Sequence, residues 1–331
     1  MSMNDPLVSV ICTCYNHETY IQNALDSVVG QSHSSLELII IDNGSGDNSL
    51  HKIQAWLSGN QSKVSVHTIF RNTPLNYCQS FNQALTMING QYVIDLSGDD
   101  VLLPHHVAIA VETLQDHPGG IYFCNAFLEE EGRMVSTFYP VGKEGKPLAR
   151  VASGDIYRQV IHRTVVCAVT LVIPTDILLG EGGYDENLSY EDFDILVRLA
   201  RKHHFIFNEH IGVKKRILKS SFSSQQYRIR SSSMLPSTLK VCYKISEMNR
   251  TPQENDALGI RLLFEAKHAL GSANFKAADG FLELAGQMRV SGTRYFLFKL
   301  WAKIELDLSF FYKHYVGFKQ RLRSPRGCSP F

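Results

Sequence analysis

Residues 36–47 read LELIIIDNGSGD, an apolar run followed at once by a polar turn that contains two glycines. The run is short, nearly continuously apolar and rich in isoleucine, which predicts a strand buried on both faces. Gly44 and Gly46 permit backbone angles that other residues avoid, and this favours a tight turn. Asp47 then stands near the N-terminus of a predicted helix, 47–57. A buried strand, a tight turn and a helix are the repeating unit of a parallel α/β sheet.

The same unit recurs on both sides of this stretch. Apolar runs alternate with segments of helical periodicity as far as residue 127, which predicts a mostly parallel central sheet flanked by helices. Residues 127–170 are less regular, and a strand, a helix and an extended segment follow them. The expected strands are 7–13, 36–42, 63–70, 90–96, 120–127 and 168–174, and the expected helices are 19–31, 47–57, 76–88, 104–117 and 190–203.

After about residue 235 the pattern becomes helical, so two domains are expected, 1–235 and 236–331. Residues 257–288 predict a helical hairpin that breaks near Gly271. A long aromatic helix with a basic end is expected over 294–326, because apolar residues recur there at alternating steps of four and three. Its bulk and its cations suit the surface of an anionic membrane, and packing on the catalytic domain or on a second subunit is the alternative.

Composition excludes several classes of protein. Hydrophobic residues make up 44% and charged residues 20% of the chain, and the net charge is +1. These values are typical of a soluble globular protein with no general attraction to nucleic acid. The seven cysteines include no CxxC pair, which argues against a disulfide framework or a zinc site. The N-terminal sequence lacks the pattern of a secretory signal, and a cytoplasmic location is expected.

Polar residues follow four consecutive predicted strands. These clusters are TCYNHE at 13–18, DNGSGD at 42–47, RNTPLNY at 71–77 and SGDD at 97–100. Parallel α/β sheets bind ligands beyond the C-terminal ends of their strands, so we expect a binding site on this rim. The turn at 42–47 suits a nucleobase pocket or merely starts a helix. The adjacent acids of 97–100 suit a divalent cation or merely cap a helix.

A further acidic pair, Glu191 and Asp192, stands at the N-terminus of a predicted helix. Compensation of the helix dipole explains one acid there, by about 0.3–1 kcal/mol, and explains a second acid less well. A carboxylate at the edge of a cleft can act as a general base.

Taken in order, these motifs resemble the inverting, nucleotide-sugar-dependent glycosyltransferases of family 2, over roughly residues 6–235. The resemblance implies the GT-A fold, which is Rossmann-like, with a helical C-terminal extension here. It also implies Asp99 as the ligand of Mn²⁺ or Mg²⁺, with Asp100 supporting it or the donor sugar. Asp192 is implied as the general base and Glu191 as the residue that orients the acceptor or the donor, and 225–232 as a loop that closes over the diphosphate. The residues implied for the nucleotide and donor are Thr13, Tyr15, Glu18, Asp42, Asn43, Arg71 and Asn82.

Three positions depart from the family pattern. Asn43 stands where a second acid is common, yet its amide oxygen can accept from a uracil imide, so a UDP-sugar is favoured and a dTDP-sugar stays compatible. Ser97 replaces the first acid of the DxD motif that ends at Asp99. Arg230 stands where a histidine is common. Arginine cannot ligate a cation, but with Arg228 it can neutralise diphosphate directly, which predicts a reduced dependence on metal.

The resemblance therefore predicts a hexosyl or hexosaminyl transferase whose acceptor is a glycan or a lipid-linked glycan. It implies a role in bacterial cell-surface polysaccharide synthesis, at the cytoplasmic face of the membrane and with self-association left open. The alternative is a nucleotide-sugar-binding scaffold with weakened catalysis, for which Ser97 and Asn43 are the support.

Overall fold

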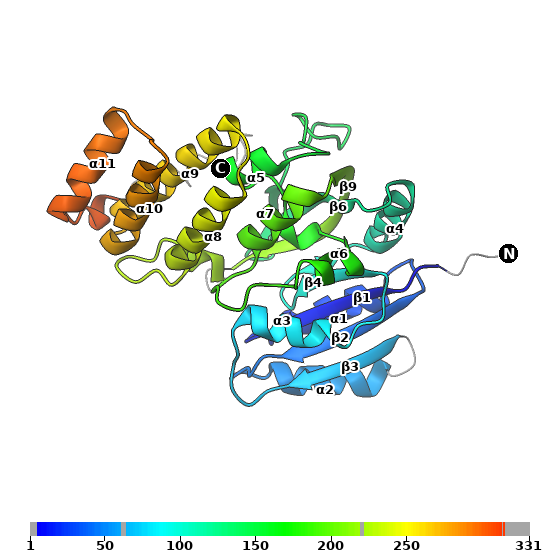
Figure 1. Ribbon diagram of the computed structural model, residues 1–331. Coiled ribbons are helices and arrows are strands. Elements are labelled where there is room, and N and C mark those ends of the chain that lie inside the picture. Colours follow the sequence, from blue (N-terminus) through cyan, green and yellow to red (C-terminus); the bar gives the residue numbers. More distant parts are fainter. Residues whose placement is uncertain (1–4, 61–63, 219–221, 313, 315–331) are drawn as a thin grey trace. The chain divides into compact units, whose positions relative to one another are not determined.

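The computed structural model describes residues 5–60, 64–218, 222–312 and 314. The chain forms two compact units that are each discontinuous in sequence (Figure 1). The first unit comprises the segments up to Asp155, Val166–Glu186 and Arg198–Ile217. The second comprises Ile156–Val165, Asn187–Val197 and the chain from Leu218 onward. The second unit therefore includes two short segments that lie inside the expected catalytic domain as well as the helical C-terminal region.

The first unit contains a five-stranded sheet whose order is β3-β2-β1-β4-β8. The first four strands are parallel, and β8 runs antiparallel to β4. Every residue of β1 and of β2 is buried, as the largely apolar runs predict. The strands are β1 (Val8–Cys14), β2 (Leu36–Asp42), β3 (Ser65–Phe70), β4 (Tyr92–Ser97) and β8 (Ile173–Pro174).

A second, mixed sheet in the same unit has the order β5-β9-β6-β7. In it β6 and β9 are parallel, whereas β5 and β7 run antiparallel to their neighbours. These strands are β5 (Val101–Leu102), β6 (Ile121–Glu130), β7 (Arg133–Thr137) and β9 (Phe205–Ile217). The helices of the first unit are α1 (Ile21–Val29), α2 (Ser49–Asn60), α3 (Tyr77–Leu85), α4 (His106–Asp116) and α6 (Thr175–Gly180).

Helix α7 (Asp192–Lys202) begins in the second unit and ends in the first. The α/β architecture with helices flanking a mostly parallel sheet confirms the predicted fold class. The expected strand at 168–174 is wrong in detail, because Ala168–Thr170 forms a 3-10 turn and only Ile173–Pro174 pairs with β4. The Thr170 hydroxyl stabilises that turn by bonding the carbonyl of Cys167 at 2.8 Å.

The second unit is helical. Helix α9 begins at Pro252 after a capping box, in which Thr251 and Glu254 satisfy each other's backbone N–H groups. It ends at Gly271, and α10 follows, so the expected helical hairpin is confirmed. The helices are α5 (Tyr157–His162), α8 (Met234–Met248), α9 (Pro252–Gly271), α10 (Phe275–Gln287) and α11 (Thr293–Ile304).

The long helix expected over 294–326 is not continuous. Helix α11 ends at Ile304, where Glu305 takes the left-handed conformation with φ 46°. The indole N–H of Trp301 donates to the carbonyl of Leu306 at 2.7 Å, and this bond stabilises the reversal. A new helical turn starts at Ser309. Residues 315–326, which carry most of the expected basic end, lie outside the described residues. None of the helices within the described residues is long and apolar enough to cross a bilayer.

Candidate active site

The C-terminal ends of four parallel strands form one polar rim in the first unit. In the registers of the sheet, Thr13 of β1 lies opposite Ser97 of β4, and Cys14 lies opposite Asp42 of β2. Asp42 in turn lies opposite Phe70, the last residue of β3. The four polar clusters that follow these strands therefore start from neighbouring points on one edge, as the sequence pattern indicates.

Reciprocal hydrogen bonds join the loop after β1 to the loop after β2. The side chain of Asn16 accepts from the backbone N–H of Gly46 at 2.7 Å. The carboxylate of Glu18 accepts from the N–H of Asn48 at 2.9 Å, and that of Asp47 accepts from the N–H of Glu18 at 3.0 Å. Glu18, a predicted pocket residue, thus stabilises the loop that leads into α2. Tyr15 from the first loop is 47% exposed.

Several buried polar atoms on this rim have no hydrogen-bond partner within the described residues. They are the Thr13 hydroxyl, Oδ1 of Asp42, Nη1 of Arg71 and Nδ1 of His17. The other carboxylate oxygen of Asp42 accepts from the N–H of Ser45 at 3.2 Å. A buried polar group left unpaired costs about 1–3 kcal/mol, so such groups gathered at one place indicate a ligand or water that completes them.

Asn43 does not offer its side chain to a ligand in this structure. Its Nδ2 donates to the carbonyl of Leu75 at 2.9 Å, and its Oδ1 accepts from the N–H of Leu75 at 3.1 Å and from the Ser80 hydroxyl at 3.2 Å. The amide holds the segment before α3 against β2. Of the two adjacent residues Asp42 and Asn43, Asp42 is therefore the one with an unused acceptor.

Asn82 of α3 also has a bonding role. Its side chain makes two hydrogen bonds to the backbone of Tyr184, at 2.8 Å and 2.9 Å, and a third to Glu186 at 3.0 Å. The hydroxyls of Tyr184 and Tyr77 both donate to the carboxylate of Asp95, at 2.8 Å and 2.6 Å. Asn82 and Asp95 together anchor the segment at 184–186 to the end of the sheet.

The acidic stretch after β4 is largely buried, because Asp99 is 8% and Asp100 is 3% exposed. The hydroxyl of Ser97 donates to Oδ1 of Asp99, so Ser97 orients the implied metal ligand. Burial, and next the neighbouring charge of Asp99, raise the pKa of Asp100 to about 7, while Lys215 and Arg216 act in the opposite direction. These cations offset part of the repulsion between two adjacent carboxylates.

Arg216, at the end of β9, is a residue of this site that the sequence analysis missed. Its backbone N–H donates to Oδ1 of Asp100 at 2.8 Å, and its guanidinium donates to the carbonyl of Asp99 at 2.7 Å and to Glu129 at 2.8 Å. The guanidinium also lies over the ring of Tyr20, 4.9 Å from its centroid. The only sequence signal was the basic run KKR at 214–216, inside a strand that otherwise looked structural.

Arg228 and Arg230, the cations expected at the diphosphate, lie in the second unit. The side chain of Arg230 forms an ion pair with Asp307, with Nε 2.9 Å from Oδ2. Its backbone N–H donates to the carbonyl of Ser272 at 2.8 Å, and its φ is 60°. In this structure the charge of Arg230 is already paired.

Asp192 opens α7 as an exposed residue of its first turn, and Glu191 directly precedes the helix. The next acid of the helix, Asp194, is buried and forms an ion pair of 2.6 Å with Lys244 of α8. This buried ion pair fixes the start of α7 within the second unit. Asp192 therefore stands at a firmly held helix N-terminus with its carboxylate in solvent.

The donor atoms near Asp99 fit a metal ion that shares its coordination with a substrate. Within the described part of the chain there is no group of three or more His, Cys, Asp or Glu that could hold a metal by itself. Mg²⁺ commonly takes one or two carboxylates, several waters and phosphate oxygens. Oδ2 of Asp99 makes no hydrogen bond to any described residue, so it is available as such a ligand.

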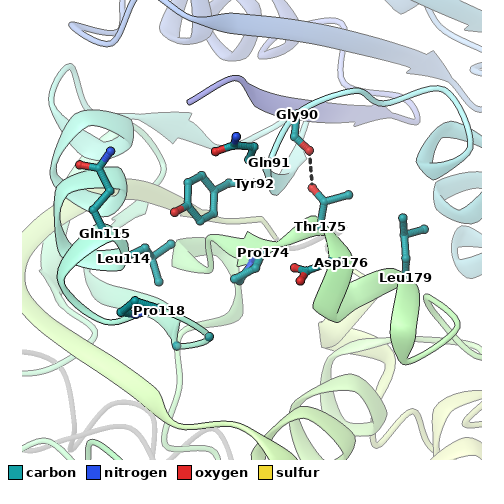
Figure 2. A pocket seen from close by; sticks show the side chains of 12 residues that line it. Gly90, Gln91, Tyr92, Leu114, Gln115, Pro118, Pro174, Thr175, Asp176 and Leu179 are labelled. Atoms are coloured by element: carbon teal, nitrogen blue, oxygen red, sulfur yellow. Dashed lines mark hydrogen bonds between the residues drawn. The ribbon is translucent and has the colours of Figure 1, made fainter. Parts of the chain in front are cut away.

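The pocket in Figure 2, of about 560 Å³, lies elsewhere. It is lined by Tyr92 at the start of β4 and by Pro174 and Thr175 where α6 begins, at the edge of the sheet opposite to the polar rim. Asp176 is the only charged side chain among the residues that line it. A pocket with one acid and no cation does not suit a diphosphate, and the rim remains the better candidate.

Comparisons with known proteins bear on the fold and on what the chain resembles. Residues 9–139 match the family described as glycosyl transferase family 2. An uncharacterised glycosyltransferase of Rickettsia typhi is 24% identical over 216 residues, 64% of each chain, so the match spans just under two thirds of that protein. A chondroitin synthase of Pasteurella multocida is 32% identical over 136 residues, which are 40% of this chain and 14% of that protein.

Two solved structures share the fold. TarS 1–349 of S. aureus in complex with UDP-GlcNAc has a TM-score of 0.64 and 16% identity, with 95% of this chain and 92% of that chain covered. The mannosyltransferase PcManGT of Pyrobaculum calidifontis, in complex with GDP-Man and Mn²⁺, has a TM-score of 0.55 and 15% identity, with 92% and 85% covered. The fold of the chain is therefore that of the GT-A glycosyltransferases, and over residues 9–139, less than half of its length, the chain is similar to glycosyl transferase family 2.

Proposed function

We propose that this protein is an inverting glycosyltransferase that moves a hexosyl or hexosaminyl group from a nucleoside-diphosphate donor to an acceptor hydroxyl. The unpartnered buried atoms of Thr13, Asp42 and Arg71 carry this proposal, because they stand on the same rim as the acidic stretch that ends at Asp100. Hydrogen-bonding atoms for a nucleoside and acids for a diphosphate-bound cation are what such a donor needs.

The proposed reaction is a single displacement. The acceptor hydroxyl attacks the anomeric carbon from the face opposite to the diphosphate, and Asp192 removes its proton. Mg²⁺ or Mn²⁺, when bound at Asp99, supplies positive charge to the leaving diphosphate. Ser97 orients Asp99, and Arg216 holds Asp99 and Asp100 in place. We propose that the dependence on metal is reduced, because Lys215 and Arg216 place positive charge beside this stretch, although Glu129 pairs with the guanidinium of Arg216.

A UDP-sugar is the favoured donor, and a dTDP-sugar is compatible. Both bases present an imide N–H, and the free oxygen of Asp42 is a suitable acceptor for it. The TarS structure with UDP-GlcNAc supports a uridine donor, whereas the PcManGT structure holds GDP-Man. GDP should therefore be tested beside UDP and dTDP.

The acceptor we propose is a glycan or a lipid-linked glycan of a bacterial surface polysaccharide. The similarity to a chondroitin synthase, whose name describes polysaccharide synthesis, supports this choice. A peripheral position at the cytoplasmic face of the membrane would give access to a lipid-linked acceptor, and self-association stays compatible with it. The second candidate is a nucleotide-sugar-binding scaffold, which the absence of one DxD acid at Ser97 favours.

Thermal shift with UDP, dTDP and GDP, each with and without Mn²⁺, tests the proposed donor. We expect the largest stabilisation with UDP, since a ligand that binds only the folded state raises its melting temperature. No shift with any nucleotide would contradict both the enzyme and the scaffold. Release of nucleoside diphosphate from a panel of sugar donors then separates the two, because a scaffold binds the donor without consuming it.

Thr13→Val is expected to weaken UDP binding about fivefold while the protein becomes more stable. The valine removes a buried hydroxyl that has no partner, and one neutral hydrogen bond contributes about 0.5–1.5 kcal/mol. Isothermal titration and chemical unfolding measure the two effects.

Thr170→Val is the matched control. That hydroxyl is also buried, but it bonds the carbonyls of Cys124 and Cys167. Its removal is expected to destabilise the protein by about 1–3 kcal/mol and to leave UDP affinity unchanged. Equal losses of affinity in both variants would show that Thr13 does not contact the nucleotide.

A further inference from the structure

The corner formed by α11 and the helical turn after it exposes an unusual amount of apolar surface. Its seven large side chains are between 49% and 69% exposed. We call this set the aromatic face; it consists of Phe296, Leu297, Leu300, Ile304, Leu306, Phe310 and Phe311. The four members on α11 are spaced one, three and four residues apart and so lie on one side of that helix, and an exposed apolar helix face marks an interaction site.

The corner is firmly packed on the rest of the second unit. A Cβ on Gly286 of α10 would lie 2.6 Å from the hydroxyl of Tyr295, so α11 rests directly on that glycine. A Cβ on Gly271 would lie 2.4 Å from the ring of Tyr312, which packs where α9 ends. The carboxylate of Asp307 also accepts from the N–H of Ser309 at 2.9 Å and begins the new turn. The exposed side chains therefore project from a fixed platform.

The charged side chains of α11 are all cations, whereas Glu305 and Asp307 in the turn after it are acidic. Arg294, Lys299 and Lys303 are exposed on α11, and the two lysines lie four residues apart on one side of the helix. After Asp307 the sequence has five Lys or Arg and no Asp or Glu. Aromatic and aliphatic side chains bordered by cations fit the boundary between the headgroups and the acyl chains of an anionic bilayer.

We propose that the aromatic face docks the protein on an anionic lipid surface. A second copy of the chain is a poorer occupant, because a symmetric contact would bring Lys299 and Lys303 toward the same cations of its partner. The segment 315–331 of the chain itself is also basic and would meet cations of its own sign. The proposal goes beyond sugar transfer and does not depend on which donor or acceptor the active site uses.

Co-sedimentation of the full chain with lipid vesicles tests the docking surface. We expect binding to mixed phosphatidylcholine–phosphatidylglycerol vesicles, little binding to phosphatidylcholine alone, and a loss of binding as salt is added. The triple variant Phe296→Ser, Phe310→Ser, Phe311→Ser is expected to bind the anionic vesicles at least tenfold more weakly, and Lys299→Glu with Lys303→Glu should do the same. Ile260→Ser on α9, where the side chain is also exposed (54%), is the matched control and should bind like the wild type.

Three outcomes would overturn the proposal. They are equal binding to neutral and anionic vesicles, unchanged binding of the triple variant, and a dimer of the wild type that the same variants dissociate. An unchanged melting temperature of each variant, measured without a nucleotide, verifies that the fold is intact. Because vesicle binding is measured without a nucleotide, its failure is distinguishable from a failure of the proposed transferase function.

Discussion

Asp192→Asn is expected to lower the turnover of sugar transfer by about 10²–10⁴-fold, the range that general-base catalysis contributes. Asparagine keeps the shape of the side chain but cannot take a proton from the acceptor hydroxyl. The start of α7 should be unperturbed, because the Asp194–Lys244 pair and the packing of Arg261 over Phe193, at 4.2 Å, remain. Product formation under saturating donor measures the effect.

The affinity for UDP distinguishes a lost base from a damaged fold. We expect Asp192→Asn to bind UDP like the wild type, since the residue is assigned to the acceptor. Asp176→Asn is the matched control, because Asp176 also lies in the first turn of a helix, α6, and should leave transfer unchanged. Near-normal turnover in Asp192→Asn would refute the assignment and would direct attention to Glu191.

Arg216→Ala is expected to weaken the binding of UDP with Mn²⁺ by about 10–100-fold and to reduce transfer further. The reason is that hydrogen bonds to charged groups contribute about 1.5–3 kcal/mol, and this guanidinium fixes the backbone at Asp99 while pairing with Glu129. Titration of Mn²⁺ into the protein with bound UDP measures the metal affinity independently of activity.

Lys214→Ala is the control for Arg216→Ala. Lys214 also pairs with Glu129, at 3.3 Å, but no hydrogen bond or ion pair joins it to Asp99 or Asp100 within the described residues. The Lys214→Ala variant should therefore bind Mn²⁺ like the wild type. Arg216→Lys keeps the charge without the planar fork and should fall between the two. If Lys214→Ala and Arg216→Ala weaken Mn²⁺ binding equally, the effect arises from Glu129 and not from the acidic stretch.

Activity in EDTA can show whether Arg230 or Arg216 reduces the dependence on metal. Partial activity in EDTA is expected for the wild type. A steep loss of transfer activity in Arg230→Ala would support the assignment of Arg230 to the diphosphate, although Asp307 pairs with that side chain here. If only Arg216→Ala becomes strictly dependent on metal, Arg216 supplies the charge. Complete loss of wild-type activity in EDTA, with Arg230→Ala unaffected, would contradict the assignment to Arg230.

The fold was predictable where burial dominates the sequence. The runs that become β1 and β2 are apolar at nearly every position, and their ends locate the rim, since strand direction follows from the alternation with helices. The hairpin of α9 and α10 was predictable for a similar reason, because its apolar periodicity breaks near Gly271. Such elements can be predicted from neighbouring residues alone, without reference to residues far along the chain.

The details of the site depend on distant partners, which no local pattern contains. The side-chain amide of Asn43 is hydrogen-bonded to the backbone of Leu75, 32 residues away. That contact exists only because the chain after β3 lies beside the end of β2. Arg216 reaches Asp99 across 117 residues because β9 pairs with β5, a strand of two residues that propensity cannot predict. The break of α11 at Glu305 was missed because the heptad spacing continues through it.

The reciprocal bonds between the loops after β1 and β2 have a kinetic consequence. Asn16 and Glu18 hold the two loops together by hydrogen bonds within the protein, so the walls of the pocket need little ordering when a nucleotide arrives. Preformed sites of this kind associate with related ligands at similar rates, and differences in affinity then arise from residence time. UDP, dTDP and GDP should accordingly enter at comparable speeds and leave at different ones, so stopped-flow dissociation would report base selectivity most directly.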